Sequence, residues 1–554
     1  MQRHLSIIFV CALLFGCANK DIKPNGHAIA SAHPAATQAG LTILNKGGNA
    51  FDAAVAVSAA LAVVEPYGSG LGGGGFWLLH RASDGKQVMI DGRETAPSQA
   101  HRDMYLDANG NPVKNASVNG ALSAGIPGMP AALVHVSKKY GRLTLADSLQ
   151  PAINLANKGF SVNKHYHRLA SFRQAILATN DSAKDIFLTN GQVPELGEII
   201  VQPDLAHTLQ QLADKGFEGF YTGDIATRLV QGVQQAGGIW TKQDLANYRI
   251  KERKPVVINY NGMKVISAAL PSSGGLVLSI ALNILEQYDL SSMDEATRIH
   301  VVVEAMRRAY KDRALYMGDS DFVEVPIEAL TKKSYAKSVA VNINLNKATP
   351  SQQLTGLNVI EGHDTTHFSV MDKEGNRVSA TLSINYPFGS GFVPPGTGVL
   401  LNDEMDDFSI KPGTPNVYGL VGGAANAIEP GKRMLSSMSP TFFETKEKIG
   451  ILGTPGGSRI ISMVLLGLLD AERGNKPTSW VNLPRYHHQY LPDQIQHEPN
   501  TFNKKLSEQL IKKGHVLKSV GRTYGNMHAI LWDKKSKKVH AASDQRGSGS
   551  AKLQ

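Results

Sequence analysis

The sequence predicts a layered α/β protein, an α+β sandwich in which strands are covered on both sides by helices. Between residues 125 and 342 the pattern is mostly helical, but the strand-like runs Val256–Tyr260 and Lys264–Ser267 interrupt it. From Thr365 onward strands and turns dominate, including Arg377–Asn385 and Ile449–Leu452, before a helix over Ile460–Leu469. With 554 residues, 42% of them hydrophobic, the chain can bury a substantial core.

The N-terminus reads as an export signal covering residues 1–17. Arg3 is followed by an apolar run from Leu5 to Phe15, and Leu14–Cys17 resembles a lipobox. Phe15 is unusual two positions before the cysteine, so ordinary cleavage after Ala18 is the alternative. We therefore expect an exported, periplasmic protein, with a lipid on Cys17 anchoring it to the outer membrane as one of the two outcomes.

Charge and cysteine content narrow the function classes. The formal charge is +10, but the lysines are scattered in short groups without interleaved aromatic residues, which argues against nucleic-acid binding. The two cysteines, Cys11 and Cys17, both lie in or at the edge of the signal. The body of the chain therefore has no disulfide, no cysteine nucleophile and no cysteine-bound zinc.

The N-terminal part begins with helices and a glycine-rich loop. A helix from Pro34 to about Asn45 and an Ala/Val-rich helix from Asp52 precede Gly68–Gly75, and the strand-like run Phe76–Leu79 follows. The loop matches the spacing of a dinucleotide-binding motif, but there the strand must come first and the helix second. We therefore predict no nucleotide, and a loop whose backbone passes close to another segment.

The stretch Val88–Pro97 is predicted to be a strand that ends in polar residues, among them Arg93. At such an edge an arginine usually forms a surface ion pair, whereas its functional alternative is a bidentate clamp for a carboxylate. The histidine groups at 165–167 and 487–488 lack the i, i+4 spacing that converges on zinc. No metal and no cofactor is predicted.

The stretch Glu361–Val370 carries the strongest chemical signal. A connector without apolar periodicity runs into a strand that opens with Thr365-Thr366. Cleavage between Asp364 and Thr365 would give Thr365 a free α-amine, whose pKa is roughly 7.7–8.0 in model compounds. One residue would then supply both nucleophile and general base. Two threonines at a strand start can equally reflect β-propensity alone.

Four motifs that occur in a fixed order favour a catalytic role for Thr365 over β-propensity alone. They are Asp364–Val370 (DTTHFSV), Asn402–Phe408 (NDEMDDF), Leu435–Pro440 (LSSMSP) and Gly453–Arg459 (GTPGGSR). Together they resemble the motifs of the γ-glutamyltranspeptidases, from about Ala28 to the C-terminus. The resemblance implies the four-layer αββα sandwich of the N-terminal nucleophile hydrolases, with a large fragment 18–364 and a small fragment 365–554 forming one globular heterodimer.

The resemblance also implies how a γ-glutamyl substrate would be held. Its α-carboxylate would meet Arg93, Ser436 and Ser437. Its ammonium would meet Glu404, Asp407 and the Asn385 carbonyl, with either Glu or Gln usual at the position of Glu404. Two acids at i and i+3 in a polar loop would otherwise be solvent-facing.

Further residues would serve the chemical step. Gly456 and Gly457 suit an oxyanion hole because glycine N–H groups can approach the oxygen closely, although a simple tight turn has the same sequence. Ser383 stands where the family usually has a threonine that bonds the nucleophile, so a modest rate loss is expected. Tyr418 matches the lid of many bacterial members and would gate the acceptor.

The predicted function is a self-processing γ-glutamyltransferase and glutathione hydrolase, using glutathione and other γ-glutamyl compounds as donors and amino acids, dipeptides or water as acceptors. One alternative is a β-lactam or other amide acylase of the same fold, against which Arg93, Glu404 and Asp407 argue. Another is a lipoprotein that binds γ-glutamyl peptides without catalysis. The Thr365, Asn385 and Gly456-Gly457 set argues against that second alternative.

Overall fold

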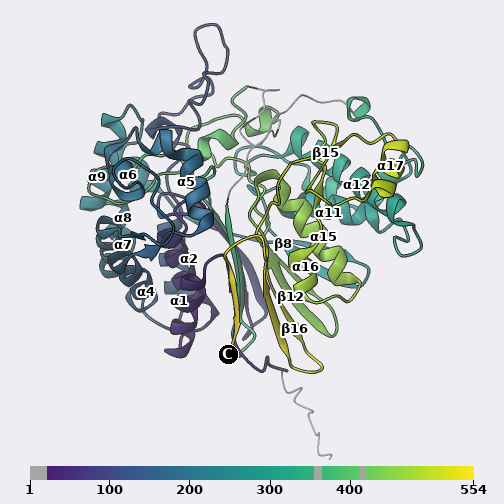
Figure 1. Ribbon diagram of the computed structural model, residues 1–554, viewed down its shortest axis with the longest axis horizontal. Helices are drawn as coiled ribbons and strands as arrows, with labels where there is room; N and C mark the ends of the chain where they lie inside the picture. Colours follow the sequence, from purple (N-terminus) through teal and green to yellow (C-terminus); the bar gives the residue numbers. More distant parts are fainter. Residues whose placement is uncertain (1–21, 355–364, 412–415, 417–419, 421) are drawn as a thin grey trace, which may run out of the picture.

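Two antiparallel sheets lie face to face at the centre of the computed structural model, which describes residues 22–354, 365–411, 416, 420 and 422–554 (Figure 1). The first sheet has the strand order β18 (Ser550–Leu553), β1 (Ala28–Ser31), β9 (Thr366–Met371), β10 (Arg377–Ser383), β2 (Gly74–Arg81), β3 (Lys86–Gly92) and β6 (Lys251–Arg253). The second has the order β17 (Val539–Ser543), β16 (His528–Asp533), β12 (Lys448–Gly453), β11 (Thr441–Glu444), β8 (Met263–Ser267) and β7 (Val256–Tyr260).

Helices cover both outer faces, which confirms the predicted four-layer α/β sandwich (Figure 1). Beside the first sheet lie α1 (Pro34–Asn45), α2 (Ala50–Val64), α3 (Met129–Tyr140), α4 (Leu145–Lys158), α5 (Lys164–Leu177), α6 (Asp181–Phe187), α7 (Pro203–Lys215), α8 (Phe217–Tyr221), α9 (Asp224–Gln235) and α10 (Lys242–Asn247). Beside the second lie α11 (Gly274–Leu285), α12 (Glu295–Tyr316), α13 (Ile327–Thr331), α14 (Lys333–Ala340), α15 (Ile460–Glu472), α16 (Pro477–Asn482) and α17 (Lys504–Lys512).

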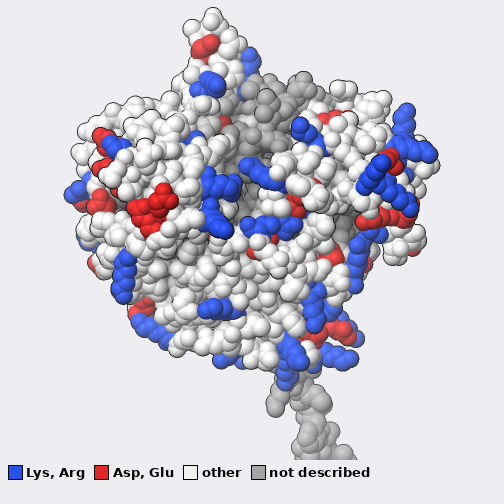
Figure 2. Space-filling model, in the orientation of Figure 1, with Lys and Arg blue, Asp and Glu red and all other residues white. Residues whose placement is uncertain are grey.

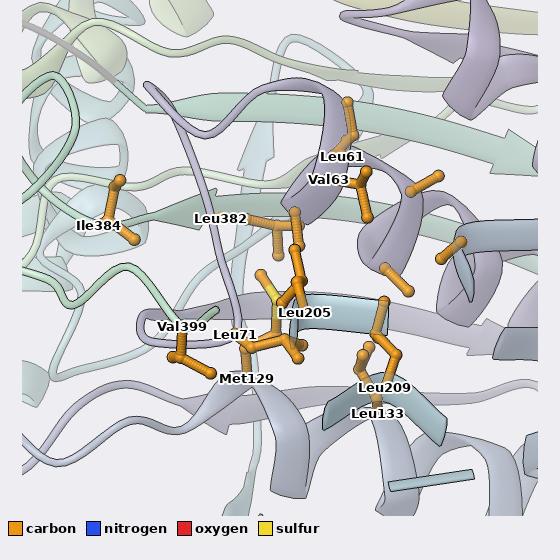
Figure 3. Close-up of a cluster of buried hydrophobic side chains, with 14 of the residues drawn as sticks. Leu61, Val63, Leu71, Met129, Leu133, Leu205, Leu209, Leu382, Ile384 and Val399 are labelled. Carbon is orange, nitrogen blue, oxygen red and sulfur yellow. The ribbon is translucent and has the colours of Figure 1, made fainter. Parts of the chain in front are cut away.

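Strand β2 shows how one sheet serves two cores. Trp77 and Leu79 point into the core between the first sheet and its helices, whereas Phe76 and Leu78 point into the core between the sheets. This period-two alternation with both faces buried is what a central strand of a layered fold requires. Figure 3 shows the first of these cores, where side chains from helices and from the end of β10 meet.

Local sequence explains several element boundaries. Helix α2 begins at Ala50, two residues before the predicted start, because Asn49 and Asp52 form a reciprocal capping box. The strand predicted to run from Arg377 to Asn385 ends earlier, since β10 stops at Ser383. Asn385 adopts a φ of 73° and leaves the sheet. Helix α15 continues three residues beyond the predicted Leu469 to Glu472.

Both sheets mix strands from before and after Thr365. Strand β9 lies between β1 and β10, and β1 also pairs with β18 at the far end of the chain. In the second sheet β11 pairs with β8. Beyond β1 and β18, the backbones of His27 and Gln554 exchange hydrogen bonds of 2.6 and 3.0 Å. The segments on either side of Thr365 therefore form one continuous hydrogen-bonded unit.

The glycine-rich loop packs tightly against two segments near the site, as predicted. A Cβ added at Gly72 would lie 2.1 Å from the Leu400 carbonyl oxygen, and one at Gly73 would lie 2.2 Å from that of Ser383. Asn402 locks the contact by donating to the Gly72 carbonyl (2.7 Å). Only residues without a side chain allow this approach. Within the described ranges, no helix has the length and apolar character needed to cross a membrane.

Candidate active site

Thr365 lies immediately before β9, a central strand of the first sheet, and is half-buried. The next residue is fixed: the Thr366 hydroxyl donates to Glu65 Oε2 (2.7 Å), and Tyr67 donates to Glu65 Oε1 (2.9 Å). Burial raises the pKa of Glu65. Thr365 lines two cavities.

The smaller cavity, with about 280 Å³ of empty volume, gathers most of the predicted site residues. It is lined by Thr365 together with Arg93, Ser383, Asn385, Glu404, Asp407, Ser436, Ser437 and Gly457. Gly456 lines the larger cavity instead. Asp364, Tyr418 and Cys17 lie outside the described residues.

Arg93 follows β3 and is almost completely buried, with 1% of its side chain exposed. Its Nη1 donates to Glu404 and its Nη2 to Asp407 Oδ2 (2.5 Å), while Nε donates to the Met434 carbonyl (3.3 Å). A planar guanidinium can donate to two carboxylates at once, because its two Nη groups point in different directions in one plane. The cation and the two acids that were predicted to bind opposite ends of an amino acid therefore form ion pairs with one another.

Glu404 and Asp407 occupy the first and last positions of a 3₁₀ turn. With three residues per turn, side chains at i and i+3 stand above one another, which directs both carboxylates to Arg93. The turn is buried, contrary to the solvent-facing alternative. Burial raises the pKa of Glu404 to about 7 against the opposing effect of Arg93, and it raises the pKa of Asp407 as well.

Ser383 and Asn385 are carried into the cavity by the turn that ends β10. The Ser383 hydroxyl accepts from the Asn385 N–H (2.8 Å), and Asn385 Nδ2 donates to the Asp403 carbonyl (3.0 Å). Asparagine tolerates the left-handed conformation better than most residues because its side chain bonds locally. These bonds hold both residues beside Thr365.

Gly456 and Gly457 adopt φ values of 140° and 54°, which favour glycine. A 3₁₀ turn, Gly457–Arg459, leads from them directly into α15. Their N–H groups thus lie at the start of a helix, where the backbone dipoles favour negative charge. The pair borders the two cavities that Thr365 also lines, a position suited to a transient oxyanion.

Arg313 and Glu94 complete the charged environment, and sequence reasoning missed both. Arg313 on α12 is buried, donates to Ser273 Oγ (2.9 Å) and Ser437 Oγ (3.3 Å), and has its pKa lowered to about 10 by burial. Glu94 lies 3.5 Å from Arg93, and burial raises its pKa well above the usual range. The adjacency of Glu94 to Arg93 was a usable signal, whereas Arg313 is one of several charged residues on a long helix and nothing in its local sequence sets it apart.

The αββα sandwich with a threonine at the head of a central strand defines the class of N-terminal nucleophile hydrolases. The family model described as Gamma-glutamyltranspeptidase matches residues 36–553. The glutathione hydrolase proenzyme of Escherichia coli K12 is 44% identical over 510 residues, covering 90% of this chain and 87% of that protein. The chain therefore belongs to the γ-glutamyltranspeptidase family.

Acylases are also among the relatives. The acylase ACY 1 proenzyme of Pseudomonas sp. V22 is 34% identical over 532 residues, covering 94% of this chain and 92% of that one. The cephalosporin acylase structure from Bacillus halodurans superposes with a TM-score of 0.83 at 27% identity, covering 99% of both chains. The γ-glutamyltranspeptidase structure from Helicobacter pylori is 42% identical, with a TM-score of 0.57, and covers 58% of this chain and 93% of that one.

Proposed function

We propose that Thr365 is the nucleophile of this self-processing γ-glutamyltransferase and glutathione hydrolase. Its hydroxyl oxygen attacks the γ-glutamyl amide carbon while the Thr365 α-amine takes the hydroxyl proton. The resulting oxyanion faces the N–H groups of Gly456 and Gly457. When the C–N bond breaks, the proton passes to the leaving amine, and a γ-glutamyl ester remains on Thr365. Water or an acceptor amine then attacks the ester and restores the threonine.

The α-amine exists only after the chain is cut between Asp364 and Thr365, so self-cleavage is part of the proposal. The products are a large fragment ending at Asp364 and a small fragment beginning at Thr365. The interleaved strands of both sheets support a heterodimer that stays together after cleavage. Amino acids and short peptides are the proposed acceptors beside water, and Tyr418 is the proposed gate for them.

The observation that carries the donor assignment is the buried triad of Arg93, Glu404 and Asp407 beside Thr365. A γ-glutamyl group brings both an α-carboxylate and an ammonium, so it can replace the internal ion pairs with matched external ones. The carboxylate would bond Arg93, Ser436 and Ser437, and the ammonium would bond the two acids and the Asn385 carbonyl. Arg313 would orient the Ser437 hydroxyl toward the carboxylate.

The two acylase relatives favour the alternative that this protein is an amide acylase. Such an acylase would differ from a γ-glutamyltransferase in not requiring the α-amine of the donor. We would compare γ-glutamyl-4-nitroanilide, its α-glutamyl isomer and glutaryl-4-nitroanilide, which lacks only the α-amine. A γ-glutamyltransferase should prefer the first donor by at least roughly 100-fold, since each unpaired buried charge costs several kcal/mol. Equal turnover of the glutaryl donor would move the acylase assignment ahead.

Export and lipid attachment at Cys17 remain a proposal supported by the N-terminal residue pattern. Several acyl chains on one cysteine would hold the protein at a membrane more firmly than a single chain. Mass spectrometry of the mature N-terminal peptide distinguishes the two outcomes. A lipid-modified Cys17 supports the anchored form, and an unmodified start at Asn19 shows ordinary secretion.

Replacement of Glu404 by Gln is expected to change the pH dependence of donor use. The pKa of Glu404 is about 7, so its carboxyl becomes protonated as pH falls through neutrality and loses its attraction for the substrate ammonium. The Thr365 α-amine must also be unprotonated. In a plot of log(kcat/KM) against pH, the acid limb of the wild type should therefore reach a slope of about 2, because two groups become protonated. The Glu404→Gln variant should reach a slope of about 1, because only the α-amine does. Identical slopes would exclude Glu404 from donor binding.

A further inference from the structure

The second cavity that Thr365 lines is much larger, with about 1760 Å³ of empty volume. It is lined by Glu65, Tyr67, residues of helix α5 and residues 522–526, among others. The smaller cavity is lined by the groups proposed to hold the γ-glutamyl part of the donor. The larger one therefore lies where the rest of the donor would leave and the acceptor would enter.

Three arginines line this cavity, and two of them, Arg168 and Arg522, are not paired with a carboxylate among the described residues. Arg546 is paired with Glu498 (2.7 Å) and Asp544 (3.2 Å). Arg168 and Arg522 are exposed, and within the described part of the chain neither has a carboxylate oxygen within 4.0 Å. Figure 2 shows Lys and Arg side chains on both sides of the hollow at the centre of this face.

The other titratable groups of the cavity do not offset these arginines. Glu65 is its one lining acid among the described residues, and its carboxyl is buried and bonded to Thr366 and Tyr67. His165 is neutral near pH 7, because burial lowers its pKa to about 4. Phe172 is 60% exposed, and the centroid of its ring lies 5.7 Å from that of Tyr386. The two rings add an apolar surface to the cavity that Arg168 also lines.

We propose that this cavity is the leaving-group and acceptor site, and that Arg168 and Arg522 make it selective for peptides and amino acids that carry a free carboxylate. The inference rests on the proposed function, because it assumes that γ-glutamyl transfer occurs at Thr365. An arginine that is not paired with a carboxylate of the protein can bond a substrate carboxylate through two N–H groups without first breaking an ion pair. The aromatic pair would contact the side chain of the bound peptide.

The test uses two donors that differ by one carboxylate on the leaving group: γ-glutamyl-4-nitroanilide and γ-glutamyl-3-carboxy-4-nitroanilide. The ratio of their kcat/KM values, carboxylated over neutral, is measured for the processed wild type and for the Arg168→Gln/Arg522→Gln variant. Because kcat/KM covers only the steps up to release of the first product, the ratio reports on the leaving-group site. We expect the ratio to fall at least tenfold in the variant.

Three controls make the result specific. Arg473→Gln, an exposed arginine at the end of α15 that does not line the cavity, should keep the wild-type ratio. Added salt should lower the wild-type ratio and leave that of the double variant nearly flat. With acceptors, glycylglycine should lose its advantage over glycylglycinamide in the double variant.

The outcomes separate the inference from the function beneath it. A ratio unchanged within twofold in the double variant would overturn the inference while leaving γ-glutamyl transfer intact. Failure of the wild type to use either γ-glutamyl donor would overturn the proposed function and the inference with it. Turnover of the neutral donor by the variant, with two fragments on a denaturing gel, shows that the substitutions leave the fold intact.

Discussion

Thr365→Ala is expected to yield a single uncut chain without γ-glutamyl transfer activity. In the proposed mechanism the Thr365 hydroxyl attacks the preceding peptide bond, so without it the α-amine proposed as general base would not be released. Loss of a nucleophile that works as a unit with its base removes at least roughly 10⁴-fold of the rate. A denaturing gel and turnover of γ-glutamyl-4-nitroanilide measure both effects, and wild-type protein should show two bands, the smaller with about a third of the residues.

Thr365→Ser is the matched control, since serine keeps both the hydroxyl and the α-amine. It should be cleaved and should retain measurable turnover. N-terminal sequencing of the smaller wild-type fragment must begin at Thr365. A different first residue, or normal cleavage of the alanine variant at this bond, would refute the assignment of the nucleophile.

Asp407→Ala is expected to be cleaved normally yet to lose about 2–5 kcal/mol of transition-state binding, which corresponds to a loss of roughly 30-fold to 4000-fold in kcat/KM. Asp407 accepts from Arg93 Nη2 (2.5 Å) and from Asn416 Nδ2 (3.0 Å). Its removal leaves the substrate ammonium with one fewer anion in a buried cavity. Cleavage of the chain does not involve a free amino-acid end, so processing is the internal control.

Two further variants sharpen this test. Arg93→Lys keeps the positive charge but cannot bridge Glu404 and Asp407 with two planar N–H groups, so it should raise KM for the donor while processing continues. Asp181→Asn, whose side chain is 96% exposed on α6, should behave as wild type. An unchanged γ-glutamyl rate in the Asp407→Ala variant would show that the donor pocket is wrongly assigned.

The layered fold could be predicted from the sequence because its signals are local. The strand-like run Phe76–Leu79 and the helix opened by Pro34 need only neighbouring residues for their recognition. The close packing of the glycine-rich loop was also predictable, because a run of residues without side chains lets the backbone approach another segment closely. Its actual partners, the Leu400 and Ser383 carbonyls, lie over 300 residues away and left no trace in the local pattern.

The internal pairing of the site was not predictable for the same reason. Arg93 and Glu404 are separated by 311 positions, and the motifs imply ligands for a substrate without showing that these ligands bond each other when the substrate is absent. Arg313 illustrates a second limit: a cation in a helix pattern is normally assigned to solvent. Only the packing of α12 against the loop that holds Ser437 brings it into the site.

The hydrogen bonds between His27 and Gln554 suggest that a chain beginning at Thr365 could be produced by rearranging the gene. Since the backbones of His27 and Gln554 are hydrogen-bonded neighbours, a short linker from Gln554 to residue 22 would close the chain there without disturbing β1 or β18. Opening the circle before Thr365 would then place this residue first, behind a removable initiator methionine. In such a circular permutant Thr365 would have a free α-amine without self-cleavage, so the turnover of substrate could be measured separately from the cleavage of the chain.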